Sequence, residues 1–121
     1  MGKFVIRRIR SGIKFDLMAA NGQIIATSEV YETKNACLNG VESVRKNATT
    51  EKVEDQTVSS KVLTNPKFEV YGDKSGAFRF RLKSRNGQII AVSEGYTTHQ
   101  ACLDGVESVR KNAPDATVEE E

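Results

Sequence analysis

Apolar and polar residues alternate along several short stretches of the chain, and each such stretch predicts a β-strand. In FRFRLK (78–83) three apolar residues alternate with three cations, which places the apolar side chains on one face of a strand. The segment IKFDL (13–17) has the same alternation. Turn-forming pairs flank both stretches, with Ser-Gly before them and Asn-Gly after them, at 11–12, 75–76, 21–22 and 86–87. The pattern therefore predicts β-hairpins in series.

The spacing of apolar residues changes after Tyr31 and Tyr96. Residues 37, 41, 44 and 48 are apolar, as are 102, 106, 109 and 113, a spacing typical of one face of a helix. Thr33 and Thr98 precede these segments and are predicted N-caps. Inside each helix a glycine (40 and 105) lies beside the apolar stripe. Glycine there costs about 1 kcal/mol relative to alanine, so we expect close approach of helix to sheet. On the outer side, Glu42 is placed to pair with Lys46.

The elements occur twice because the chain is an internal duplication. A shift of 65 positions aligns residues 13–48 with 78–113, and about 24 of the 36 positions are identical, among them the whole of GVESVRKNA. A weak strand is predicted after each helix, at 52–54 and at 117–119. We predict repeat one at 1–54, a linker at 55–66 and repeat two at 67–121. Together they should form one compact domain, since a shared core buries more surface than two separate halves.

The series F-x-F-x-L, N-G-Q-I-I-A, S-E-x-Y and A-C-x-x-G-V-x-S-V-R-K-N-A, present twice, resembles the YegP-like family of small bacterial proteins of unknown function. The resemblance implies an α+β fold of two tandem β(3)-α-β repeats sharing one antiparallel sheet, with the helices packed on it. It also implies that the C-terminal strands are exchanged between the repeats. No activity, cofactor or catalytic residue comes with the family, so the resemblance assigns no site.

The composition is typical of an ordinary soluble domain, with 38% hydrophobic and 28% charged residues. The opening MGKFVIRRIRSG has too short an apolar run for a signal sequence, and no stretch approaches the roughly 18 apolar residues of a membrane span. We therefore expect a cytoplasmic protein without a membrane partner. Cys37 and Cys102 occupy equivalent repeat positions, and we expect both to be buried, reduced thiols.

Four cations define what we call the basic strand: Arg79, Arg81, Lys83 and Arg85. Such a row can follow a phosphate backbone, with Arg7, Arg8 and Arg10 as additional cations. The favoured interpretation is charge pairing, because a two-residue loop at Asn86-Gly87 would place Arg79 opposite Glu94, and the equivalent loop would place Lys14 opposite Glu29. Repeat one has Asp16, Met18 and Ala20 at the remaining positions, so the basic strand belongs to repeat two alone. Aromatic stacking partners are also missing from that face.

Other candidate sites are weaker. Tyr31 and Tyr96 lie near a strand-to-helix turn, where they either line a small-molecule pocket or close the core. His99 and Cys102 are three positions apart, but Lys34 replaces the histidine in repeat one, and so few ligands make a poor zinc site. No catalytic triad or phosphate-binding loop motif occurs. The sequence predicts a non-enzymatic protein of unknown role, without cofactor or metal, whose partners it does not identify. Two alternatives stay open: nucleic-acid or polyanion binding, which is not favoured, and small-molecule binding near the two tyrosines.

Overall fold

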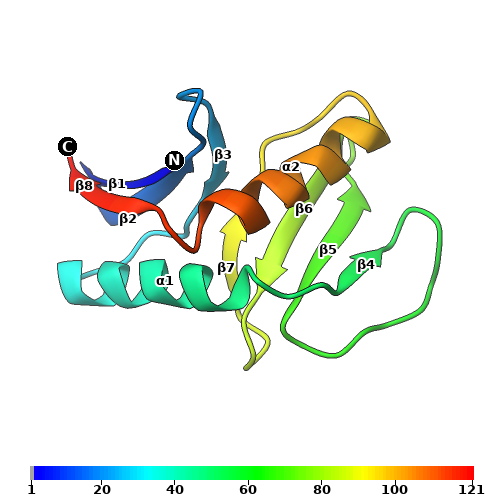
Figure 1. Ribbon diagram of the computed structural model, residues 1–121, viewed down its shortest axis with the longest axis horizontal. Helices are drawn as coiled ribbons and strands as arrows, with labels where there is room; N and C mark the ends of the chain where they lie inside the picture. The colour runs from blue at the N-terminus through cyan, green and yellow to red at the C-terminus, as the bar shows by residue number, and fades with distance from the viewer. Residues whose placement is uncertain (1) are drawn as a thin grey trace.

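The structure is a computed structural model, and it describes residues 2–121. Repeat one contributes three strands, a helix and a short fourth strand: β1 (Lys3–Ile9), β2 (Gly12–Met18), β3 (Ile24–Thr27), α1 (Lys34–Asn47) and β4 (Val53–Asp55). Repeat two has the same order: β5 (Lys67–Gly72), β6 (Phe78–Lys83), β7 (Ile89–Val92), α2 (His99–Asn112) and β8 (Thr117–Glu120). The α+β class and the two β(3)-α-β units predicted from the sequence are confirmed (Figure 1).

All eight strands form one sheet, in the order β4-β5-β6-β7-β3-β2-β1-β8. Strand β4 follows α1 in the chain but pairs with β5 of repeat two, and β8 pairs with β1 of repeat one. The C-terminal strands are therefore exchanged between the repeats. The six central strands are antiparallel as expected, whereas the exchanged strands β4 and β8 run parallel to their neighbours β5 and β1.

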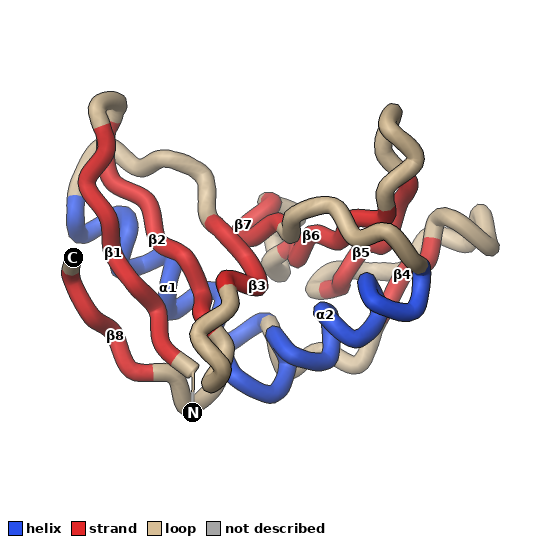
Figure 2. The backbone as a smooth tube through the Cα atoms, turned by 90° about the horizontal axis from the view of Figure 1, so that it is seen from above, coloured by secondary structure: helices blue, strands red, loops and turns tan. Residues whose placement is uncertain are grey.

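A pseudo-twofold axis relates the two repeats and passes between β3 and β7. The single residue pair that joins these strands is Thr27 with Val92, which are equivalent positions under the 65-residue shift. Both helices lie on one side of the sheet, so the other face is free of helices (Figure 2). The core between helices and sheet contains four fully buried phenylalanines, Phe4, Phe15, Phe68 and Phe80.

The predicted helix features are largely confirmed. The side chains of Thr33 and Thr98 accept hydrogen bonds from the backbone N–H groups of Ala36 and Ala101, at 3.1 and 3.0 Å. The expected ion pair between Glu42 and Lys46 was wrong: Glu42 instead contacts Arg45 one residue earlier, with 3.3 Å between Oε1 and Nε. Arg45 is the better partner because it lies partly buried beside the helix rather than out in solvent.

Arg45 and Arg110 each hold the segment that leads to an exchanged strand. Nη1 of Arg45 donates to the carbonyl oxygens of Pro114 and Ala116 at 3.1 and 2.7 Å, between α2 and β8. Nε of Arg110 donates to the Thr50 carbonyl at 2.9 Å, between α1 and β4. Each arginine belongs to the helix of one repeat and binds the backbone of the other repeat. The two arginines therefore stabilise the exchanged positions of β8 and β4.

Candidate functional site

The basic strand lies on the sheet face opposite the helices, and carboxylates neutralise most of it. Arg79 Nε is 2.7 Å from Asp73 Oδ2, and Arg81 Nε is 2.6 Å from Glu69 Oε1. Lys83 Nζ lies 3.4 Å from the other Glu69 oxygen. Within residues 2–121, Arg85 forms no ion pair. The structure therefore separates the four predicted site residues into three that are paired and one that is free.

The expected contact between Arg79 and Glu94 was wrong because the strand register shifts. Arg81 is paired with Val92, and the N–H of Ser93 bonds to the Phe80 carbonyl, but the next bridge joins Phe78 to Tyr96. Two residues of one strand therefore oppose one of the other, and Glu94 is displaced from Arg79. In repeat one Lys14 likewise contacts Asp16, at 3.0 Å, rather than Glu29.

The turn after β6 also differs from the two-residue loop that we expected. Within residues 2–121 only glycines have positive φ, and Gly87 is at 85° while Asn86 is not, which rules out a turn needing both residues left-handed. The backbone of Ser84 bonds to both Gly87 and Gln88, each at 2.9 Å, so the loop contains three residues. Lys83 is consequently paired with Ile89, whereas a two-residue loop would have paired it with Ile90, and Arg85 is the first residue of the turn.

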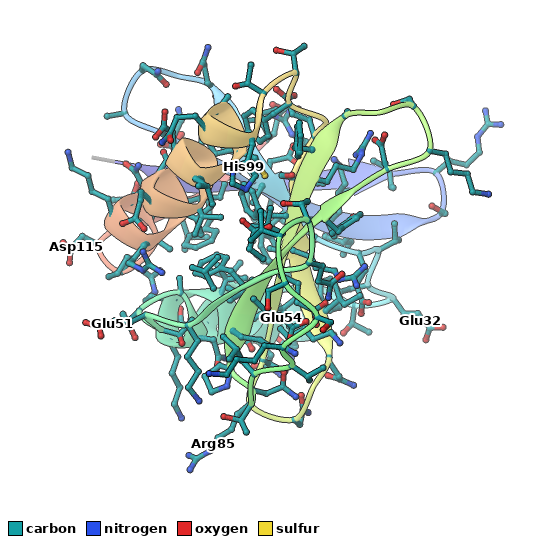
Figure 3. All side chains as sticks on the ribbon, turned by 90° about the vertical axis from the view of Figure 1, so that its right-hand side faces the viewer. Glu32, Glu51, Glu54, Arg85, His99 and Asp115 are labelled. Carbon is teal, nitrogen blue, oxygen red and sulfur yellow. The ribbon has the colours of Figure 1, made fainter. Side chains whose placement is uncertain are left out.

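Glu69 belongs to a buried ionic cluster with Lys67 and Glu54. Lys67 Nζ is 2.5 Å from Glu54 Oε1 and 3.1 Å from Glu69 Oε2, and all three side chains are at most 5% exposed. The Leu63 N–H donates to Glu54 at 2.7 Å, from the segment between β4 and β5 that faces the viewer in Figure 3. Burial pushes the pKa of Glu54 upward, but hydrogen bonds from Lys67, Gln56 and Leu63 outweigh this and lower it to about 2. Glu69 is therefore a fixed structural anion that occupies Arg81 and Lys83.

The two tyrosines pack into the helices. The Tyr96 ring stacks on Phe80 with centroids 6.3 Å apart, and its hydroxyl points at Gly105 of α2. Tyr31 stacks on Phe15 in the same way and approaches Gly40 of α1. Burial raises the pKa of both phenols above the ordinary value. Helix and sheet do come close at the glycines, as predicted, and the tyrosine rings fill the remaining space.

His99 and the cysteines do not form a metal site in the described chain. His99 Nε2 lies 2.6 Å from Asp55 Oδ2, and within residues 2–121 no three His, Cys, Asp or Glu side chains are grouped to hold a metal ion. Cys37 and Cys102 are free and buried, as expected. Burial, followed by the charge of Asp55, raises the pKa of Cys102 to about 11, so this thiol is a poor nucleophile.

Two grooves related by the pseudo-twofold axis lie where each helix meets the Asn-Gly turn of the other repeat. The first, which we call the basic groove, has a volume of about 400 Å³ and is lined by Asn39, Glu42, Ser43, Lys46, Asn47, Ser84, Arg85, Asn86 and Gln88. The second, the acidic groove, has about 600 Å³ and is lined by Gly2, Ala19, Ala20, Asn21, Asp104, Glu107, Ser108, Lys111, Asn112 and Asp115. The outward-facing residues of the repeated helix thus line both grooves.

The basic groove combines free cations with neutral hydrogen-bonding groups. In the part of the chain that the structure describes, Arg85 and Lys46 form no ion pair, and both side chains are exposed. The carboxylate of Glu42 is engaged by Arg45. The amides and hydroxyls of the lining supply further donors. Arg85 points outward from the body of the molecule (Figure 3). The sequence singled out Arg85 and missed Lys46, which has no local feature that distinguishes it from other solvated helix lysines such as its repeat equivalent Lys111.

The acidic groove differs from its counterpart at a few positions. Asp104 replaces Asn39, and Ala19 and Ala20 replace Ser84 and Arg85. Relative to the basic groove, the acidic groove therefore lacks the cation Arg85 and has the additional anion Asp104, while Lys111 is equivalent to Lys46. Of the two grooves, only the basic groove therefore has an excess of unpaired positive charge among residues 2–121.

Comparison with known proteins places this fold in a family. A model described as a domain of unknown function (DUF1508) matches the chain twice, at residues 12–55 and 73–120. The chain belongs to the DUF1508 family. A UPF0339 protein of Pseudomonas aeruginosa is 37% identical over 120 residues, which cover 98% of this chain and 96% of that protein. A UPF0339 protein of Treponema denticola is 65% identical over 54 residues, 45% of this chain but 93% of its own length.

Solved structures agree with the family assignment. The solution NMR structure of the protein of unknown function yegP from E. coli has a TM-score of 0.82 at 32% identity, covering 99% of this chain and 92% of that one. A UPF0339 protein from Shewanella oneidensis has a TM-score of 0.78 at 29% identity, covering 98% and 90%. The resemblance to YegP-like proteins is thereby confirmed. The family description names no activity, so the chemistry of this DUF1508 chain has to be argued from its own residues.

Proposed function

We propose that the protein is a non-enzymatic binding module whose basic groove takes an anion bearing phosphoryl groups. The supporting observation is that two cations without ion pairs, Arg85 and Lys46, and several neutral hydrogen-bond donors line the same groove of about 400 Å³. An arginine fork and a lysine, with amide donors between them, suit an anion that offers several oxygen acceptors. A non-enzymatic role is supported by the single histidine, which faces Asp55 rather than a nucleophile.

The expected affinity is modest. Hydrogen bonds to charged groups contribute about 1.5–3 kcal/mol each, and association costs at least about 4 kcal/mol of lost freedom. Two such contacts leave at most about 2 kcal/mol after this cost, and several weaker hydrogen bonds of about 1 kcal/mol each bring the expected Kd for a small phosphorylated molecule to about 0.1 mM to a few mM. A chain of phosphates would bind more tightly, because it offers several phosphate groups to the two cations.

The location that we propose is the cytoplasm. None of the helices within residues 2–121 is long and apolar enough to cross a membrane. The two cysteines are free thiols, which suits a reducing compartment. Phosphorylated metabolites and nucleic acids are both present there, and the test must separate them.

Fluorescence anisotropy with a short labelled single-stranded oligonucleotide tests the proposal, with unlabelled inorganic tripolyphosphate as competitor. We expect binding that weakens between about 50 and about 200 mM salt. Arg85→Ala, which copies repeat one, should weaken it about tenfold or more. Displacement by tripolyphosphate at low concentration would favour a small phosphorylated ligand, and resistance to it would favour a nucleic-acid backbone.

A matched control is present in the chain. Lys111→Ala changes the acidic groove at the position equivalent to Lys46→Ala, so only the second should weaken binding. The proposal would be removed if the oligonucleotide does not bind at low salt and tripolyphosphate causes no shift of the melting temperature. Binding that survives Arg85→Ala and Lys46→Ala but is lost in Arg79→Ala would move the site to the basic strand.

A further inference from the structure

The chain contains three Asn-Gly pairs, at 21–22, 39–40 and 86–87. An asparagine followed by glycine can deamidate: the backbone nitrogen of the glycine attacks the side-chain carbonyl carbon, and ammonia leaves. Glycine favours this attack because no side chain shields its nitrogen. The resulting succinimide ring takes up one water and opens at either carbonyl, to aspartate or to isoaspartate. Each product carries a carboxylate where the asparagine amide was neutral.

The fold presents the three pairs differently. Asn39 and Gly40 lie inside α1, where the Gly40 nitrogen belongs to the helical hydrogen-bond ladder and the residue is buried against Tyr31. Asn86 is exposed in the turn between β6 and β7, and Asn21 is exposed at the equivalent position between β2 and β3. The two turn pairs can therefore react in solvent, whereas the helical backbone restrains the third.

One hydroxyl group distinguishes the two turns. The Ser84 hydroxyl donates to Oδ1 of Asn86. In repeat one Ala19 stands at the position of Ser84, so among residues 2–121 no hydroxyl donates to Oδ1 of Asn21. The other contacts are shared. In both turns the backbone N–H two residues later donates to Oδ1, at 3.3 Å for Asn86 and 3.0 Å for Asn21, and the glycine N–H donates to a backbone carbonyl at 2.9 Å.

The Ser84 hydroxyl favours the reaction at Asn86. When the Gly87 nitrogen attacks, negative charge develops on Oδ1 of Asn86, and a donor already directed at that oxygen stabilises the charge. A hydrogen bond to an anionic oxygen is about twice as strong as one to a neutral oxygen, so this donor lowers the barrier. Ser84 is buried, so little water competes for its hydroxyl. The adjacent Arg85 contributes less, because it is exposed and salt screens its charge.

We propose that Asn86 is a deamidation site, favoured over Asn21 and Asn39, and that its reaction places a carboxylate in the basic groove. Asn86 lines this groove together with Arg85 and Lys46. The new anion follows Arg85 directly in the chain and offsets one of the two cations that have no ion pair. Deamidation therefore lowers the affinity of the groove for anions. This consequence rests on the function proposed above, whereas the modification itself does not.

Peptide mapping by mass spectrometry measures the three sites separately. During incubation of the folded protein at mildly alkaline pH, we expect Asn86 to convert about three- to tenfold faster than Asn21, and Asn39 to be the slowest. Ser84→Ala copies repeat one and should slow the reaction at Asn86 by a similar factor. Ala19→Ser copies repeat two and should accelerate the reaction at Asn21.

The two variants keep the test decisive if one of them does not fold, which melting curves report. Equal rates at Asn21 and Asn86 in the parent protein would overturn the proposal. An unchanged rate at Asn86 in folded Ser84→Ala, or at Asn21 in folded Ala19→Ser, would also overturn it.

Asn86→Asp carries the charge of the product and tests the regulation separately. We expect it to weaken binding of the labelled oligonucleotide about fivefold, and Asn21→Asp, which changes the acidic groove, to leave binding unchanged. Equal affinity of Asn86→Asp and the parent protein would overturn the regulation. If the parent protein does not bind the oligonucleotide, the proposed function fails, while the rates at Asn86 and Asn21 still decide the modification.

Discussion

Gly105 in α2 tests how closely the helix approaches the sheet. A Cβ atom at this position would lie 2.5 Å from the Tyr96 hydroxyl oxygen and 2.9 Å from both Tyr96 Cζ and Phe80 Cε2. Side-chain contacts this short do not occur without movement of one partner. The tyrosine cannot simply swing away, because its ring is stacked on Phe80, which is fully buried. Gly105→Ala should therefore force the helix and the sheet apart.

Two effects of opposite sign decide the magnitude. Alanine in a helix interior is favoured over glycine by about 1 kcal/mol. Overpacking a dense core costs about 1–3 kcal/mol, and three close contacts on a stacked ring place this site toward the upper end. The net expectation is a destabilisation of about 1–2 kcal/mol. For a chain of this size that lowers the melting temperature by about 3–8 °C.

Urea and thermal unfolding of Gly105→Ala measure this loss. Asp104 is the exposed neighbour of Gly105 in α2, so Asp104→Ala serves as a control that introduces alanine into the same helix without a close contact to Tyr96. Tyr96→Phe removes the oxygen nearest to the new Cβ, so the double variant Gly105→Ala with Tyr96→Phe should recover part of the loss. A Gly105→Ala protein that melts at or above the parent temperature would refute the close-packing argument.

The remaining predictions concern the exchange and the buried charges. Ending the chain at Asn112 removes β8 and its ion pairs, so the urea midpoint should fall, and an unchanged midpoint would count against β8 as part of the sheet. Arg110→Lys should cost about 1–2 kcal/mol in urea unfolding, because lysine cannot donate from an Nε to Thr50 while contacting Glu107; equal stability would contradict the fastening role. Glu54 has a folded pKa below its unfolded value, so its stabilisation is complete above about pH 4.5 and is lost as the pH falls toward 2. The acid part of the stability profile should therefore be flatter in Glu54→Gln, and an identical slope would refute this assignment.

The sequence predicted the elements because each depends on local pattern. Alternation, helical spacing and a threonine before each helix are all properties of neighbouring residues. The register was harder to predict, because Asn86-Gly87 fits both a two-residue turn and a three-residue turn with glycine last. The extra residue between Ser93 and Tyr96 carries no sequence signal, and it moved Glu94 away from Arg79. The general expectation of charge pairing was right for Arg79, Arg81 and Lys83, but their partners were not predictable.

The exchange and the groove depend on contacts between repeats. Strands β4 and β8 have three and four residues, and the pattern of such short strands fits their own repeat as well as the other. The exchange was therefore expected from the resemblance and not from periodicity. Lys46 and Arg85 are 39 positions apart and meet only because α1 reaches across to the β6–β7 turn. Arg85 could be singled out from its own strand, whereas Lys46 had no local feature to distinguish it from any solvated helix lysine.

Of the cations on the basic strand, Arg85 rather than Arg81 is the residue to replace when the basic groove is tested. Replacing Arg81 by Asp, as in repeat one, would place a second carboxylate beside the buried Glu69, which is 3% exposed. Repeat one tolerates Asp16 at this position because Arg7, Lys14 and Thr27 surround it. In repeat one the carboxylate is on β2 and its arginine on β1, whereas in repeat two the arginine is on β6 and its carboxylate on β5. Replacing one residue of such a pair by its repeat equivalent therefore leaves the other without a partner. Arg85 has no such partner among residues 2–121, so Arg85→Ala is the substitution that changes charge without disturbing the fold.

The identity of GVESVRKNA in both repeats follows from these contacts. Its glycine admits a tyrosine, its valines fill the core, and its glutamate orients the arginine that fastens the other repeat's exchanged segment. Its asparagine amide donates to the serine carbonyl one turn earlier, at 2.8 Å in both helices. These contacts are the same in both repeats. The lysine alone has no such contact within residues 2–121. The residues that surround it differ between the repeats, at Asn39, Ser84 and Arg85, and this is where a function specific to one groove would arise.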